Sequence, residues 1–145
     1  MIYAPSTVAV VGSINQDVTL SVAEFPAAGQ TLLARNSVRT IGGKGANQAL
    51  AAAMVSAKVE MIGCVGQDSG GDEALTLFAA HGVNSAGVVR TPAAPTGSAY
   101  ICVRGDGENF IVVDPGANAL VTVDRFTVEG FAAYSWVLLN LEIPW

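Results

Sequence analysis

The sequence predicts an α/β fold in which helices alternate with buried strands of a parallel sheet. Two short β-branched runs, 7–12 and 59–66, are typical of strands that are buried on both faces. The run 45–57 is rich in helix formers, and a second helical segment begins after Asp68 as its N-cap and stops at Gly82. This alternation predicts helices packed against a parallel sheet.

The last quarter of the chain continues the same pattern. A helix is expected over 122–134, capped by Thr122 or Asp124, followed by a buried strand over 136–142. A strand of this kind normally needs a covering helix after it. We therefore expect the fold to be incomplete at the C-terminus.

Two elements do not fit a parallel sheet. The segment 31–40 alternates weakly and predicts a more exposed strand. Within 98–113, two apolar runs flank the turn sequence "GDGE" and predict a hairpin. Together these elements predict a separate small sheet that forms a flap.

Composition narrows the classes of function. The 145 residues suffice for one domain with a real core, and the net charge of −5 disfavours nucleic acid as the main partner. No apolar run approaches the ~18 residues of a membrane span, and no basic leader precedes the first apolar run. The two cysteines, Cys64 and Cys102, lie in apolar runs and are expected to be reduced. A soluble cytoplasmic protein is the expectation.

The stretch "IGGKGANQA" (41–49) could be a phosphate cradle at a helix start, but its spacing matches neither nucleotide motif. The Walker pattern requires glycine where Val38 stands and Ser or Thr where Gly45 stands. The dinucleotide fingerprint requires glycine where Gln48 stands. Two interpretations stay open: a tight turn with close strand–helix packing, or a helix-start site that binds hydroxyls or a carboxylate as well as phosphate.

A second polar group, "GSINQD" (12–17), follows the first buried strand, where ligands of α/β folds bind. Asn15 and Asp17 project to one side of an extended chain, and an amide with a carboxylate suits a diol. Lys44 and Asn47 would add further polar groups. The alternative is a local turn capped by the Asp17 side chain.

Several segments together resemble the ribokinase branch of the phosphofructokinase-B-type sugar kinases. "VVGSINQD" resembles the first sugar-contact segment, and "GGKGANQA" resembles the first family signature in its ribokinase form. Three further segments follow in the expected order and spacing: "GCVGQDSGGDE", "TGSAYICVRGDGENFIVVDPGANA" and "LLNLEIP". The resemblance covers nearly the whole chain.

The resemblance implies a ribokinase-like layered α/β sandwich with a small β lid, its strands near 31–41 and 98–113, and a homodimer formed through the lids. It implies ATP-dependent phosphorylation of D-ribose at the 5-hydroxyl, assisted by Mg²⁺, with a small-molecule sugar as partner and no nucleic acid or membrane. Carried over residue by residue, the sugar-binding residues would be Asn15, Asp17, Gly43, Lys44, Asn47, Ile101 and Glu142.

The family's second signature, Gly-Ala-Gly-Asp, which carries the catalytic base, does not occur in the sequence. "PGANA" (115–119) is superficially similar but has Asn118 where the base would stand, and it matches a different family segment. By the family's order of segments, the base is expected beyond Trp145.

We therefore expect residues 1–145 to be the N-terminal, sugar-binding half of one domain, with no catalytic, ATP-binding or metal-binding residue of its own. Two alternatives remain: a sugar-binding half-domain without catalysis, or a family kinase for fructose, a nucleoside or a keto-sugar acid.

Overall fold

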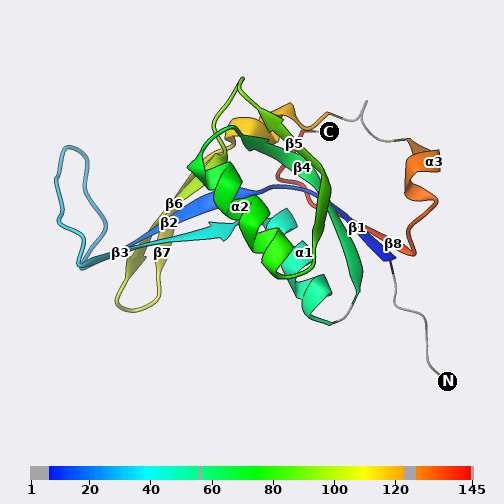
Figure 1. The fold of residues 1–145 in the computed structure, drawn as a ribbon. Helices are drawn as coiled ribbons and strands as arrows, with labels where there is room; N and C mark the ends of the chain where they lie inside the picture. The colour runs from blue at the N-terminus through cyan, green and yellow to red at the C-terminus, as the bar shows by residue number, and fades with distance from the viewer. Residues whose placement is uncertain (1–6, 56, 123–126, 145) are drawn as a thin grey trace.

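The computed structural model describes residues 7–55, 57–122 and 127–144, and these form two four-stranded sheets (Figure 1). In the main sheet all strand pairs are parallel, in the order β5–β4–β1–β8. Its strands are β1 (Thr7–Val11), β4 (Lys58–Gly66), β5 (Asn84–Thr91) and β8 (Trp136–Leu139). The predicted α/β fold with a parallel sheet is confirmed.

The second sheet, called the lid sheet below, projects from one end of the main sheet (Figure 1). Its order is β3–β2–β6–β7, with β2 and β6 parallel and the two outer pairs antiparallel. Its strands are β2 (Asn15–Val22), β3 (Asn36–Gly42), β6 (Gly97–Arg104) and β7 (Asn109–Asp114). The elements that did not fit a parallel sheet therefore do form a small sheet of their own.

Helices α1 (Lys44–Met54) and α2 (Ser69–Ala80) pack on one face of the main sheet. On β4, Met61 and Val65 point into the core beneath the helices, whereas Cys64 packs on the opposite face. The 3₁₀ helix η1 (Gly116–Leu120) covers that opposite face. Because side chains alternate between the two faces of a strand, β4 contributes to an apolar cluster on each face of the main sheet.

The predicted ends of α2 are confirmed. Asp68 is the N-cap, and its carboxylate accepts the backbone N–H of Gly71 at 2.9 Å. The same carboxylate accepts the Thr96 hydroxyl at 2.6 Å, which ties the start of α2 to the segment that leads into β6. Gly82 follows the helix with φ 71°, the left-handed conformation that glycine adopts without strain.

The exposed strand starts later than predicted. The antiparallel register pairs Ser21 with Asn36, and the Arg35 N–H still donates to the Ser21 oxygen at 2.8 Å. Because β2 ends at Val22, residues 31–34 lie beyond the strand that they would pair with. Strands β2 and β5 have no counterpart in the sequence prediction beyond the extended start at Asn15. Helix α1 ends at Met54, three residues before the predicted end.

The C-terminal elements are shorter than predicted. Helix α3 spans only Val128–Phe131, and its cap is Thr127, whose hydroxyl accepts the Gly130 N–H at 3.0 Å, rather than Thr122. The other predicted cap, Asp124, lies outside the described residues.

Trp145, beyond which the catalytic base is expected, also lies outside the described residues. The position of that base therefore stays a prediction from the family's order of segments.

The prediction of a buried last strand was wrong. Strand β8 pairs with β1 on one side only, and within the described part of the chain nothing pairs with its other edge. Trp136 is 65% exposed and Leu139 is 56% exposed. Neither Cys64 nor Cys102 is in a disulfide, and no helix in the described residues is long and apolar enough to cross a membrane.

The open, apolar edge at β8 predicts that the 145-residue chain self-associates, because unpaired strand edges recruit further strands. Sedimentation velocity over a concentration series is expected to show oligomers. Leu139→Lys, which places a charge on that edge, should shift the distribution toward monomer. Leu33→Lys is the matched control, since Leu33 is 92% exposed on the loop between β2 and β3. A clean monomer for the unmodified chain would contradict the prediction.

Candidate functional site

A cavity of about 240 Å³ lies where the main sheet passes into the lid sheet. Six residues from three distant segments line it: Ser13, Asn15, Val113, Pro115, Asn118 and Glu142. Ser13, Asn15 and Asn118 are buried. Because two predicted sugar-binding residues, Asn15 and Glu142, are among them, this cavity is the candidate site.

The glycines of "GGKG" bring the start of α1 against the turn between β1 and β2. A Cβ on Gly45 would lie 2.7 Å from the carbonyl carbon of Gly12, and one on Gly43 would lie 2.7 Å from the Ser13 oxygen. Gly43 also has φ 87°, which strongly favours glycine. The Ala46 N–H donates to the Ser13 oxygen at 3.0 Å. The interpretation as close strand–helix packing is therefore confirmed.

Glu142 lies after β8 and contacts both the turn between β1 and β2 and the start of α1. Its carboxylate accepts the Ser13 hydroxyl at 2.7 Å and forms an ion pair with the Lys44 ammonium group. The Lys44 backbone N–H also points at it, at 3.4 Å. Burial opposes ionisation of Glu142, but the hydrogen bonds from Lys44 and Ser13 outweigh it and lower its pKa. The positive end of α1 thus faces a carboxylate of the chain itself.

Asp17 is in the opposite situation. Its Oδ1 is buried and has no hydrogen-bond partner among the described residues, and a Cβ on Gly42 would lie only 2.0 Å from its Oδ2. Burial raises the pKa of Asp17, and the negative charge of Glu142 raises it further. A buried acceptor without a donor is rare in native structures, and it marks a place where a ligand can supply one.

Strand register places further residues on the face of Asp17. Asp17 pairs with Ala99 on β6, and Ala99 pairs with Val113 on β7. Paired residues share a face of a sheet, as do alternate residues along a strand. Asn15, Asp17, Ile101 and Val113 therefore lie on one face of the lid sheet, and Val113 reaches the cavity.

The structure thus gathers most of the predicted residues around one junction. Asn15 and Glu142 line the cavity, and Asp17 and Ile101 share a lid face with Asn15. Gly43 and Lys44 form the start of α1 beside Glu142, and Asn47 lies exposed one turn further along that helix.

Sequence reasoning missed Ser13, Val113, Pro115 and Asn118 as site residues. Asn118 stands in the "PGANA" segment, which resembles the catalytic signature only superficially. Its partners, Ile14 and Asn15, are more than a hundred residues away, so no local pattern reveals them.

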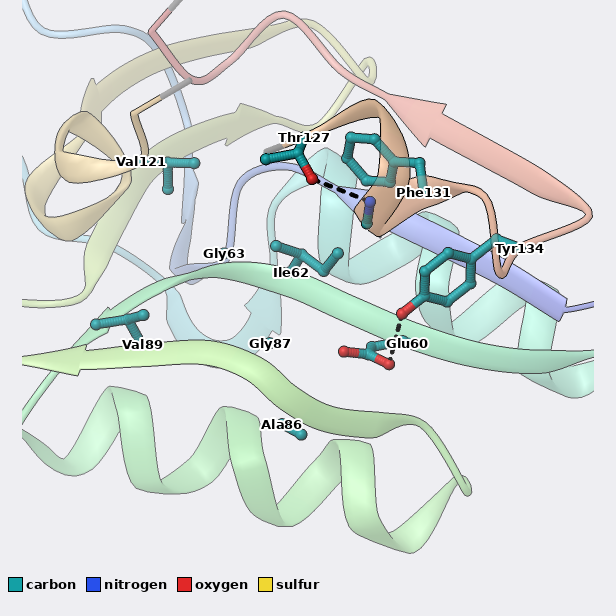
Figure 2. Close-up of a pocket in the computed structure, with 11 residues that line it drawn as sticks. Glu60, Ile62, Gly63, Ala86, Gly87, Val89, Val121, Thr127, Phe131 and Tyr134 are labelled. Carbon is teal, nitrogen blue, oxygen red and sulfur yellow. Dashed lines mark hydrogen bonds between the residues drawn. The ribbon is translucent and has the colours of Figure 1, made fainter. Parts of the chain in front are cut away.

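A second cavity of about 360 Å³ lies between α3 and the β4–β5 face (Figure 2). Its polar groups already satisfy one another, since the Tyr134 hydroxyl donates to Glu60 at 2.8 Å and this bond raises the pKa of Tyr134. The remaining lining is largely apolar, including Ile62, Val89 and Phe131, and none of the predicted site residues lies there.

Comparison with known proteins agrees with the geometry. Residues 5–136 match the family model for the pfkB family carbohydrate kinases. The chain belongs to this family.

Among curated proteins, this pfkB-family chain is 40% identical over 140 residues to the ribokinase of Haemophilus influenzae, covering 95% of this chain and 46% of that protein. It is 37% identical to the ribokinase of Bacillus subtilis, covering 94% of this chain and 47% of that protein. The chain is therefore a ribokinase homologue that spans about half the length of the curated relatives it matches.

Solved structures show the same relationship. Ribokinase from Thermotoga maritima superposes with a TM-score of 0.87 at 34% identity, covering 96% of this chain and 46% of that one. Arabidopsis thaliana ribokinase, solved with ribose and ATP, gives a TM-score of 0.81 at 32% identity, covering 98% of this chain and 47% of that one. The ribokinase-like fold is therefore shown.

The pfkB family uses ATP, and the resemblance to sugar kinases implies Mg²⁺ beside it. Across 7–55, 57–122 and 127–144, no three His, Cys, Asp or Glu side chains gather where they could hold a metal ion. None of these residues is assigned to the ion.

Asp17→Asn is expected to stabilise the ligand-free chain at neutral pH. A carboxyl group whose pKa is raised by folding favours the folded state only below its unfolded pKa, and that contribution is lost as the pH rises through the folded pKa. An amide of the same shape removes the cost of the buried charge. Chemical denaturation at pH 7 should show a higher midpoint for the variant, and the difference should shrink toward about pH 3, where the carboxyl is protonated in both states.

Asp106→Asn is the matched control for this substitution. Hydrogen bonding from Arg104 lowers the pKa of Asp106 to about 2, the reverse of the shift at Asp17. The denaturation midpoint of the Asp106→Asn variant at pH 7 should equal that of the unmodified chain or lie below it. A lower midpoint for Asp17→Asn at pH 7 would contradict the burial cost assigned to Asp17.

Proposed function

We propose that this chain is the sugar-binding part of an ATP-dependent, cytoplasmic kinase of ribokinase type, whose reaction transfers the γ-phosphoryl group of ATP to the 5-hydroxyl of D-ribose. The observation that carries the proposal is the buried carboxylate oxygen of Asp17, which nothing in the described part of the chain bonds and which lies on the face that Asn15 shares. A sugar hydroxyl supplies the donor that this oxygen lacks.

The neighbouring residues suit a polyol with one apolar face. Asp17 accepts from hydroxyls, Asn15 adds an amide, and Glu142 offers further acceptor positions beside Ser13. Ile101 and Val113 give the lid face an apolar surface for the C–H side of the sugar ring.

The start of α1 closes the other side of the proposed site. Gly43 packs directly against Ser13, since a Cβ on it would lie 2.7 Å from the Ser13 oxygen, so its proposed part in sugar binding is its backbone and the position it gives to the start of α1. The Lys44 ammonium group is paired with Glu142, but its side chain is 66% exposed. An ammonium group has three donors, so it can also donate to a sugar oxygen. Asn47, exposed on the same helix, is placed to bind a hydroxyl from that side.

Phosphoryl transfer needs more than a bound sugar. It depends on the positioning of ATP and on groups that stabilise charge on the transferred phosphoryl group. The sequence contains no Gly-Ala-Gly-Asp segment for the base, and no residue described here is assigned to ATP or Mg²⁺. The 145 residues alone are therefore expected to bind sugar without useful turnover.

Association through the lid sheet is part of the proposal. Tyr100, Phe110 and Val112 are each about half exposed on the face of that sheet opposite Asp17. Apolar side chains gathered on one sheet face suit contact with a second copy.

The identity of the sugar is the finer question. The relatives include the deoxyribokinase of Salmonella typhimurium, 34% identical over 139 residues and covering 94% of this chain and 45% of that protein. A titration panel of ribose, 2-deoxyribose, fructose and adenosine discriminates among these substrate classes. Ribose is expected to bind most tightly.

Asp17→Asn should weaken ribose binding. A hydrogen bond to a charged group contributes about 1.5–3 kcal/mol, which corresponds to roughly a ten- to hundredfold loss of affinity. Isothermal calorimetry on the unmodified chain and the variant measures this, with Asp106→Asn as the control for an Asp-to-Asn change far from the site.

Unchanged ribose affinity in Asp17→Asn would overturn the assignment of Asp17 as a sugar contact. A coupled ATP assay on the same chain should show no ordinary kinase turnover with ribose. Turnover at the rate of a complete kinase would contradict the proposed division between binding and catalysis.

A further inference from the structure

The side chain of Asn118 connects η1 to the turn between β1 and β2. It is 2% exposed and makes three hydrogen bonds. Its Oδ1 accepts the Ile14 N–H at 2.9 Å, and its Nδ2 donates to the Ile14 oxygen at 3.1 Å. The third bond joins its Nδ2 to Oδ1 of Asn15 at 2.7 Å.

The backbone of Ile14 fixes which way the Asn118 amide points. A backbone N–H only donates and a backbone oxygen only accepts, so the oxygen of Asn118 must face the former and its NH₂ group the latter. The other orientation would lose both bonds in a buried place, at a large cost. The orientation of Asn118 therefore follows from the chain and is not a free choice.

That orientation in turn fixes Asn15. The NH₂ group of Asn118 can only donate, so the atom of Asn15 that it contacts must be the oxygen. No hydrogen bond among the described residues uses the NH₂ group of Asn15, although Asn15 lines the cavity. Asn15 is thus left with two donors to offer and with its acceptor already bonded.

Gly97 leaves the room that this contact needs. It pairs with Asn15 across β2 and β6, and a Cβ on it would lie 2.2 Å from Nδ2 of Asn118 and 2.5 Å from Oδ1 of Asn15. The first residue of β6 is therefore part of the same arrangement.

We infer that Asn118 is a positioning residue that holds the Asn15 amide with its NH₂ group available to the cavity, so that Asn15 donates to a sugar oxygen while Asp17 accepts from a hydroxyl. The inference rests on the proposed function for its ligand. It assigns a direction to each of the two polar contacts: one hydroxyl oxygen of the sugar must accept, and another hydroxyl must donate.

The first measurement needs no variant and no sugar. In the isotope-labelled chain, NMR couplings across hydrogen bonds identify donor nitrogen and acceptor carbonyl directly. We expect couplings from the Ile14 nitrogen to Cγ of Asn118 and from Nδ2 of Asn118 to Cγ of Asn15. A coupling in the reverse direction, from Nδ2 of Asn15 to Cγ of Asn118, overturns the inference.

The second measurement is ribose affinity by calorimetry in Asn15→Ala, Asn118→Asp and the double variant. An aspartate at 118 keeps the shape but cannot donate, so Asn15 turns its NH₂ group toward it and away from the cavity. We expect each single variant to lose about three- to tenfold in affinity. The double variant should lose no more than Asn15→Ala alone, because a residue acting only through Asn15 has nothing left to act on.

Asn36→Asp, at the exposed start of β3, is the matched control and should bind ribose like the unmodified chain. Unchanged affinity in Asn118→Asp, or additive losses in the double variant, overturns the positioning role. If Asn118→Asp does not fold, the couplings in the unmodified chain still decide the orientation. Failure of the unmodified chain to bind ribose contradicts the proposed function, whereas the couplings separately decide whether Asn118 orients Asn15.

Discussion

The structure depends on how the turn between β1 and β2 satisfies its buried backbone. Here the chain leaves the main sheet and enters the lid sheet, so its polar groups cannot all be paired by either ladder. Buried backbone groups must nevertheless be hydrogen-bonded. The Gly12 N–H bonds to Ile62, the Ser13 oxygen accepts from Ala46, and Ile14 is satisfied by the side chain of Asn118.

This requirement explains why the candidate site lies at the turn. The start of α1, the helix η1 and the segment after β8 all converge there to supply hydrogen bonds. The same segments bring Lys44, Asn118 and Glu142 beside Asn15. What holds the two sheets together therefore also assembles the polar groups of the site.

The two carboxylates of the site differ in their hydrogen bonding. Glu142 is bonded to Ser13 and Lys44, whereas one buried oxygen of Asp17 has no partner within 7–55, 57–122 and 127–144. A charge held in this way lowers the stability of the ligand-free fold and raises the gain when a donor arrives. The trade is typical of binding sites, which are seldom optimised for stability.

The sequence predicted the local and periodic features well. The buried runs that became β1 and β4, the Asp68 cap and the β6–β7 hairpin all follow from residue types within a few positions. Strand β2 was missed because its polar start looks like a loop. The exposure of β8 was missed because an apolar run does not reveal whether the chain covers it.

Residue chemistry and family resemblance pointed to Asn15, which lines the candidate cavity, and to Asp17, which shares a face of the lid sheet with it. Asn118 was not predictable, because an asparagine in a Pro-Gly turn has an ordinary local explanation. Its role depends on contacts more than a hundred residues away, which only the fold brings together.

The pKa of Asp17, measured by an NMR titration of its carboxyl carbon with and without ribose, tests the central claim most directly. In the ligand-free chain the pKa should lie above the usual value of about 3.9. Saturating ribose should lower it, because hydroxyl donors favour the charged carboxylate. An ordinary pKa in the free chain that ribose leaves unchanged would contradict the assignment of Asp17 as an acceptor held ready for a sugar.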